Sequence, residues 1–137
     1  MEPKRIVFST ATPNDQGGII PNEVIRFDRF LKNPVILKGH DWEGLMLGKM
    51  TDIRLEDNAW TGVPVFHRLT AESREYDDLY QAGFLKACSI GGLSQWKSDR
   101  RGKPELDKDG LKLCTGFDLY EVSMVSLPSN PDAVLGS

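Results

Sequence analysis

The stretch LKLCTGFDLYEVSMVSL, Leu111 to Leu127, is a largely apolar run with polar residues interspersed, and the turn sequence PSNP follows it directly. A run of this kind that ends at proline and turn residues predicts one long β-strand. Apolar or alternating runs of similar character occupy residues 5–10, 34–39, 45–57, 59–69 and 84–96. This many strands with little helix between them indicate a mainly β domain.

Helices are predicted in two places. TAESREYDDLYQAG, residues 70–83, begins at a possible cap, Thr70, and ends at a possible terminator, Gly83. Its buried face is expected to carry Tyr76, Leu79 and Tyr80. PNEVIRFDRFLKNP, residues 21–34, predicts one or two short helices. We therefore expect an α+β chain, mainly β with a few helices, forming a closed or nearly closed antiparallel β-barrel with the helices packed outside.

Length and composition favour one domain over residues 1–137, because 137 residues with 39% hydrophobic content suit a single modest core. We expect a flexible start at residues 1–4, a mobile charged loop at 97–110 and a tail at 132–137. A net charge of −3, from 17 basic and 20 acidic residues, argues against a nucleic-acid partner. No apolar run approaches the roughly 20 residues of a membrane span, and no signal-like segment is visible, so a soluble, cytoplasmic protein is expected.

Cofactor and metal motifs are weak in this chain. Its two cysteines and two histidines show no ligand or disulfide spacing, so reduced thiols and no metal are expected. GLMLGKMT has three residues between its glycines and Met50 after the lysine, which argues against a phosphate-binding loop. We predict that the protein uses no cofactor.

FLKACSIGG, Phe84 to Gly92, places a thiol and a hydroxyl side by side, Cys88 and Ser89. Successive side chains of a strand point to opposite faces, so only one of the two can meet a given base. Small residues in a strand often serve only close packing, and no Gly-x-Ser-x-Gly elbow surrounds Ser89. A catalytic role therefore needs partners elsewhere in the chain.

Two residues could supply those partners. His40 ends the apolar run in NPVILKGHD, where a strand can deliver an imidazole to the rim of a cleft, although a structural histidine is the more frequent outcome. Glu121 lies within apolar sequence, where a carboxylate must face water or have a partner. A serine needs a base, and that base works best beside a carboxylate, so Ser89, His40 and Glu121 fit the three roles of a catalytic triad. His67 has less context and is expected to be structural.

The chain resembles the prohead (procapsid) maturation proteases of tailed bacteriophages, which are similar in fold to the herpesvirus assemblins. The resemblance rests on three blocks in this order: NPVILKGHD, GFLKACSIGG and LYEVSMVSLPSNPDA. The resemblance extends from about Arg5 to Ala133. It implies a serine endopeptidase that acts in the host cytoplasm, inside the assembling procapsid. The substrates implied are scaffold protein, the scaffold-like part of the capsid protein, and the protease itself.

By the same resemblance, His40 is the general base, Ser89 the nucleophile, and Glu121 takes the place of the second histidine of assemblins. A carboxylate can hold an imidazole equally well. Assemblins meet the oxyanion near a turn that would fall at residues 126–128, but this chain lacks their arginine pair there, and Pro128 has no amide hydrogen. No oxyanion donor is therefore assigned. Assemblins are dimers, so a homodimer is an expectation by analogy.

Other interpretations stay open at this point. The chain could be a non-catalytic capsid-assembly or scaffold-binding module of the same fold, or a generic soluble β domain. Cys88 could replace Ser89 as the nucleophile if the strand faces were shifted by one residue.

Overall fold

Residues 4–134 are described by a computed structural model of the chain. The strands are β1 (Ile6–Thr10), β2 (Gly18–Ile19), β3 (Ile25–Arg26), β4 (Val35–Lys38), β5 (Gly48–Glu56), β6 (Ala59–Phe66), β7 (Ala87–Trp96) and β8 (Lys112–Val125). The helices are the 3₁₀ turn η1 (Asn22–Val24), α1 (Asp28–Lys32) and α2 (Ala71–Gln81). Strands dominate over a few helices, as the sequence predicts.

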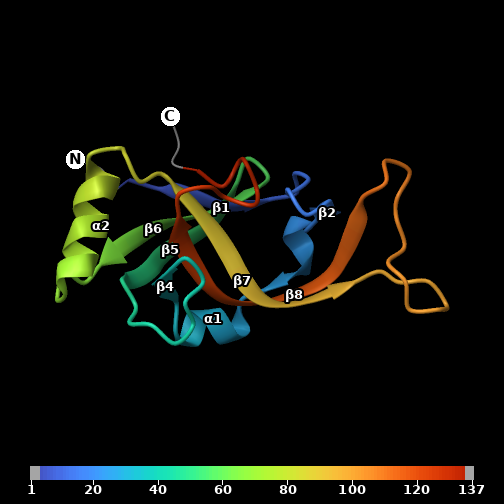
Figure 1. Cartoon of the computed structure of the whole chain (residues 1–137), viewed down its shortest axis with the longest axis horizontal. Helices are drawn as coiled ribbons and strands as arrows, with labels where there is room; N and C mark the ends of the chain where they lie inside the picture. Colours follow the sequence, from blue (N-terminus) through green and yellow to red (C-terminus); the bar gives the residue numbers. More distant parts are fainter. Residues whose placement is uncertain (1–3, 135–137) are drawn as a thin grey trace.

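Strand β8 is the centre of the sheet, and β7 pairs antiparallel along nearly its whole length. The long curved pair of β7 and β8 dominates Figure 1. Three shorter strands, β2, β3 and β4, pair in turn along the other edge of β8, and all three run parallel to it. The length and apolar character of residues 111–127 are what allow one strand to hold four neighbours.

From β4 the sheet continues through antiparallel pairs to β5, β6 and β1. The sheet curls into an open half-barrel. The prediction of a closed or nearly closed antiparallel barrel is therefore wrong in two respects: the sheet is mixed, and it does not close. The parallel pairs form because the turns and helix α1 that connect β2, β3 and β4 bring the chain back so that each strand runs in the direction of β8. Apolar periodicity in the sequence does not predict such connections.

The two edges of the half-barrel, β1 and β7, are joined by the chain after β8 instead of by a ladder of their own. Val7 donates its amide to the carbonyl of Val134, and Cys88 donates to the carbonyl of Ala133, at 3.2 and 3.1 Å. Val134 also forms an isolated antiparallel bridge with Ala87. Residues 132–134 of the predicted tail thus pack on the sheet, and Ala133 is buried. The expectations for residues 1–3 and 135–137 lie outside the described residues.

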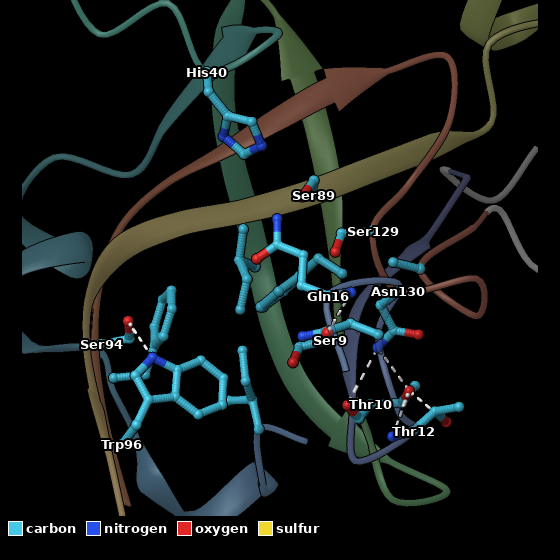
Figure 2. Close-up of a pocket in the computed structure, with 16 residues that line it drawn as sticks. Ser9, Thr10, Thr12, Gln16, His40, Ser89, Ser94, Trp96, Ser129 and Asn130 are labelled. Carbon is cyan, nitrogen blue, oxygen red and sulfur yellow. Dashed lines mark hydrogen bonds between the residues drawn. The ribbon is translucent and has the colours of Figure 1, made fainter. Parts of the chain in front are cut away.

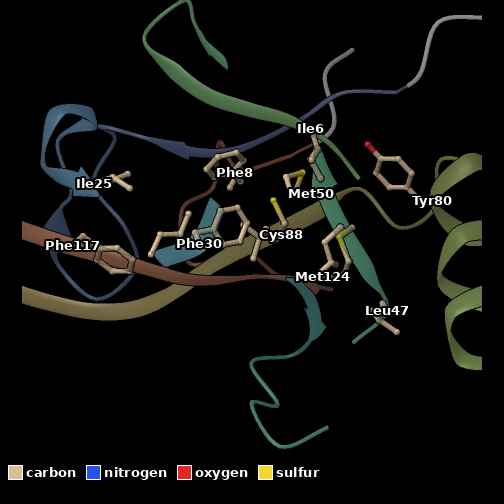
Figure 3. Close-up of a cluster of buried hydrophobic side chains, with 14 of the residues drawn as sticks. Ile6, Phe8, Ile25, Phe30, Leu47, Met50, Tyr80, Cys88, Phe117 and Met124 are labelled. Atoms are coloured by element: carbon tan, nitrogen blue, oxygen red, sulfur yellow. The ribbon is translucent and has the colours of Figure 1, made fainter. Parts of the chain in front are cut away.

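The core fills the concave side of the half-barrel, as Figure 3 shows. It includes Phe8 from β1, Phe30 from α1, Met50 from β5 and Met124 from β8. Cys88 of β7 lies in the same cluster, fully buried, and its thiol contacts the carbonyl of Val7 at 3.3 Å. One face of β7 therefore belongs to the core, and the other is left for different contacts.

Helix α2 lies at one end of the sheet (Figure 1), beside β6. Its predicted cap is confirmed, because the side chain of Thr70 accepts a hydrogen bond from the amide of Ser73. Tyr80 is buried against Phe66, as its place on the helix face predicts. Leu79 is 46% exposed, so its placement on the buried face is wrong: Ser73 takes the buried position and donates to the carbonyl of Leu47.

Residues 97–110 form a two-turn excursion between β7 and β8. The carboxylates of Asp99 and Asp107 each accept two backbone amides within the turn that they begin. The mobility of this loop stays a prediction. Within residues 4–134, no helix has the length and apolar character needed to cross a bilayer.

Candidate active site

His40 follows β4 in a tight turn. The amide of Asp41 donates to the carbonyl of Lys38 at 3.0 Å, and the two central residues, Gly39 and His40, both have positive φ, 53° and 61°. Glycine adopts this conformation freely, but for histidine it is unfavourable and needs support from its surroundings. A non-glycine residue held in this way is more frequent at functional sites than elsewhere.

Glu121 of β8 is 1% exposed and lies directly beneath this turn. Its Oε2 accepts hydrogen bonds from Nδ1 of His40 at 2.7 Å and from Nε1 of Trp42 at 2.9 Å. Because a carboxylate can only accept, the imidazole carries its hydrogen on Nδ1, which leaves Nε2 as the free acceptor of the neutral ring. The buried Glu121 carboxylate thus has hydrogen-bond partners, although the side chains of His40 and Trp42 are themselves partly exposed.

Ser123, two residues further along β8, connects the carboxylate to the turn. Its hydroxyl donates to Oε1 of Glu121 at 2.8 Å and accepts the backbone amide of His40 at 2.8 Å. The side chain is fully buried. Ser123 therefore fixes both the carboxylate and the strained backbone that carries the imidazole.

Gly91 of β7 pairs with Glu121 across the strands. A Cβ atom at this position would overlap Oε2 of Glu121 and come within 3.1 Å of Nδ1 of His40. Only glycine leaves room for the imidazole and carboxylate to meet against the backbone of β7. The register also shifts immediately after this residue, between Gly91 and Gly92.

Ser89 lies two residues before Gly91 and so shares its face of β7, with Ser123 as its cross-strand partner. Its neighbour Cys88 points to the core instead, and burial raises the pKa of that thiol far above its usual range. The thiol is therefore kept protonated, which removes its nucleophilic form. The strand faces follow the alternation expected from the sequence.

A pocket of about 210 Å³ lies along β7, on the side that faces β1. His40 and Ser89 both line it, and in Figure 2 the imidazole extends from its turn toward the strand that carries Ser89. No hydrogen bond joins the two side chains within residues 4–134. Catalytic hydrogen bonds of this kind are often long before substrate binds and tighten in the complex.

The protonation of His40 is governed by its partner. The hydrogen bond to Glu121 raises the pKa of His40 above its ordinary value of 6.5, while partial burial opposes that rise. The carboxylate accordingly favours the imidazolium that forms when a histidine takes a proton. The arrangement has the charge distribution of a base that is held and polarised by an acid.

His67, which the sequence predicts to be structural, lies away from this site. Its Nε2 is 2.7 Å from the carbonyl of Met46, and its Nδ1 accepts the amide of Leu69. In the part of the chain that the structure describes, no group of three or more His, Cys, Asp or Glu side chains is placed to hold a metal ion.

Three residues of the site have no role in the sequence interpretation: Trp42, Gly91 and Ser123. Strand alternation does place Ser123 on the face of Glu121 and Gly91 on the face of Ser89, so that signal was present. Trp42 gives no comparable signal, because it lies in irregular chain after the turn.

Comparisons of the chain with protein-family models, with curated proteins and with solved structures each find no match. A function for this chain is therefore argued from its own sequence and from the geometry of the site.

Proposed function

We propose that this protein is a serine endopeptidase in which Ser89 is the nucleophile, His40 the general base and Glu121 the residue that orients and polarises the base. The observation that carries the proposal is the buried Glu121 carboxylate, which holds Nδ1 of His40 at 2.7 Å in a pocket that also contains Ser89. Burying a carboxylate costs free energy, and a catalytic role explains why one is kept at this position. Orienting and polarising a catalytic histidine requires a carboxylate beside its imidazole.

The reaction that fits these groups is acyl transfer. Nε2 of His40 takes the proton from Oγ of Ser89 as Oγ attacks the carbonyl carbon of a peptide bond. The imidazolium then gives that proton to the leaving amine, and the acyl group stays on Ser89. Water, deprotonated by the same imidazole, releases the acid and regenerates the hydroxyl.

We further propose that the substrates are those of a procapsid protease: scaffold protein, the scaffold-like part of the capsid protein, and the chain itself. The resemblance of the three sequence blocks to the phage maturation proteases supports this choice, and the blocks contain His40, Ser89 and Glu121 in the order that it requires. A homodimer, and action inside the procapsid, belong to the same proposal.

The second candidate is a non-catalytic assembly module of the same fold. It is favoured by one observation, the absence of a direct hydrogen bond between His40 and Ser89 within residues 4–134. Such a module would keep the pocket for binding and would leave Ser89 with the low reactivity of an ordinary hydroxyl.

Labelling with a fluorophosphonate separates the two candidates without a known substrate. The reagent should form one covalent adduct on Ser89, found by peptide mass spectrometry, and Ser89→Ala and His40→Ala should abolish it. Ser98→Ala, at an exposed serine in the loop between β7 and β8 and outside the pocket lining, is the matched control and should label normally. In parallel, the wild-type chain at high concentration should cleave itself and its capsid protein. Both cleavage rates should be about 10³-fold or more higher than the rates measured with the Ser89→Ala variant. Folded wild-type protein that takes no label would support the binding module.

A further inference from the structure

Among residues 4–134, the side chains that line the pocket beside Ser89 include no permanently charged one. Its walls are apolar side chains such as Phe8, Ile90 and Trp96, together with hydroxyl and amide groups, and of the described lining residues His40 alone is titratable. It extends from the candidate triad along β7 to Trp96, as Figure 2 shows. A volume of about 210 Å³ is room for one side chain.

Most polar groups of the lining are already paired with neighbours. Asn130 donates to Thr10, Trp96 donates to Ser94, and the hydroxyl of Ser129 donates to Asp15. These bonds shape the walls and leave few free partners for a ligand.

Besides Ser89, two polar side chains of the lining, Ser9 and Gln16, take no part in these hydrogen bonds within residues 4–134. Ser9 is 2% exposed and lines the pocket. Gln16 is an exposed residue that lines the pocket, and in the view of Figure 2 its side chain lies between Ser89 and the indole of Trp96. An amide and a hydroxyl offer donors and acceptors together, which matches a ligand that has both.

We infer that this pocket is the specificity site of the proposed protease and takes an uncharged side chain beside the scissile bond, with Gln or Asn preferred. The inference rests on the proposed function. An ionised side chain entering the pocket would lose water and find no counter-ion, which is costly, whereas an amide can replace its water with Gln16 and Ser9.

The principal rival occupant is a basic side chain. Asp15 and Asp132 lie behind the wall, but each carboxylate accepts a hydroxyl of a lining residue, Ser129 and Thr12, and neither lines the pocket itself. Their charge therefore reaches the pocket only through an intervening side chain.

The test is a pooled library of decapeptides, each residue type present at each position, with cleaved bonds read by mass spectrometry. One position flanking the cleaved bond should favour Gln and Asn and exclude Lys, Arg, Asp and Glu. In the Gln16→Glu variant, cleavage of peptides with Lys or Arg at that position should increase about tenfold relative to cleavage of peptides with Gln there. Gln81→Glu, an exposed glutamine on α2 away from the pocket, should leave the profile unchanged.

The possible failures differ. If neither the library nor the capsid protein is cleaved and no phosphonate adduct forms, the proposed function itself is wrong. If peptides are cleaved but Lys, Arg or Glu dominates beside the bond, or Gln16→Glu leaves every position unchanged in a folded protein, the specificity site is wrong and the protease stands.

Discussion

Ser123 and Glu121 lie two residues apart on one face of β8, and the hydroxyl of Ser123 donates to Oε1 of Glu121 at 2.8 Å while accepting the amide of His40. Ser123→Ala removes a donor and an acceptor from a fully buried place. We expect a loss of about 1–3 kcal/mol in the free energy of unfolding, because two buried groups lose their partner. Chemical denaturation measures it, with Ser126→Ala as the exposed control.

The same substitution should lower kcat by about tenfold with little change in KM, since Ser123 positions the base without lining the pocket. The backbone amide resonance of His40 should move in the variant, because its acceptor is lost. An unchanged His40 amide would contradict the positioning role even if stability fell.

The pH dependence of activity should follow His40. Its pKa is raised above 6.5 by the hydrogen bond to Glu121, and the base works only when neutral, so kcat/KM should fall with a midpoint above 6.5 as the pH decreases. Glu121→Gln should move that midpoint down and lower the rate. An NMR titration of His40, assigned with a His67→Gln variant, gives the pKa independently of turnover.

Stability should respond to pH with the opposite sign. A histidine whose pKa is higher in the folded state than in the unfolded state stabilises the fold fully below its unfolded pKa, and this contribution is lost as the pH rises through the folded pKa. The unfolding free energy of wild type minus that of His40→Ala should therefore stay constant well below pH 6.5 and decrease as the pH rises from there through the higher folded-state pKa. A flat difference across the histidine range would remove the link between His40 and Glu121.

Gly91→Ala tests whether the imidazole and carboxylate need the space above β7. The added methyl overlaps Glu121, so activity should fall about 10²-fold as the pair is forced apart. A double-mutant cycle isolates the cause. In a Glu121→Ala background the carboxylate is gone, so Gly91→Ala should then cost clearly less unfolding free energy than it does in wild type. Equal costs in the two backgrounds would place the clash elsewhere.

Cys88→Ala should retain catalytic activity and lose stability. The thiol is fully buried in the core and protonated, so native protein should not react there with iodoacetamide. The substitution should cost about 1 kcal/mol of unfolding free energy, the usual size of a small core deletion. If Cys88 were alkylated rapidly and this alkylation stopped phosphonate labelling, Cys88 and not Ser89 would be the nucleophile.

The local rules of strand and helix identify most of the elements in this chain. Alternation separates Cys88 from Ser89, and the core position of the thiol follows from that alternation. Thr70 predicts the start of α2, because its capping hydrogen bond involves only a residue close to it in the sequence. These features are decided within a few residues, so one sequence suffices to predict them.

What the sequence does not report is how strands far apart pair. The parallel pairing of β2, β3 and β4 with β8, and the residues Ala133 and Val134 between β1 and β7, depend on contacts across the whole chain. Trp42 is missed for the same reason, because only the turn at His40 brings its indole over Glu121. The sequence identifies His40 and Glu121 as candidates separately. The parallel pairing of β4 and β8 brings Nδ1 of His40 to 2.7 Å from Oε2 of Glu121.

The position of β8 in the chain has a consequence for biosynthesis. Glu121 belongs to β8, the last strand within residues 4–134, and the neighbours of that strand, β2, β3, β4 and β7, are all made before it. A ribosome that has released residues 1–110 has exposed His40 and Ser89 but has not yet supplied the carboxylate that holds the imidazole. The contact between His40 and Glu121 can therefore form only after β8 has been made, so under the proposed function a growing polypeptide lacks the polarised base until then.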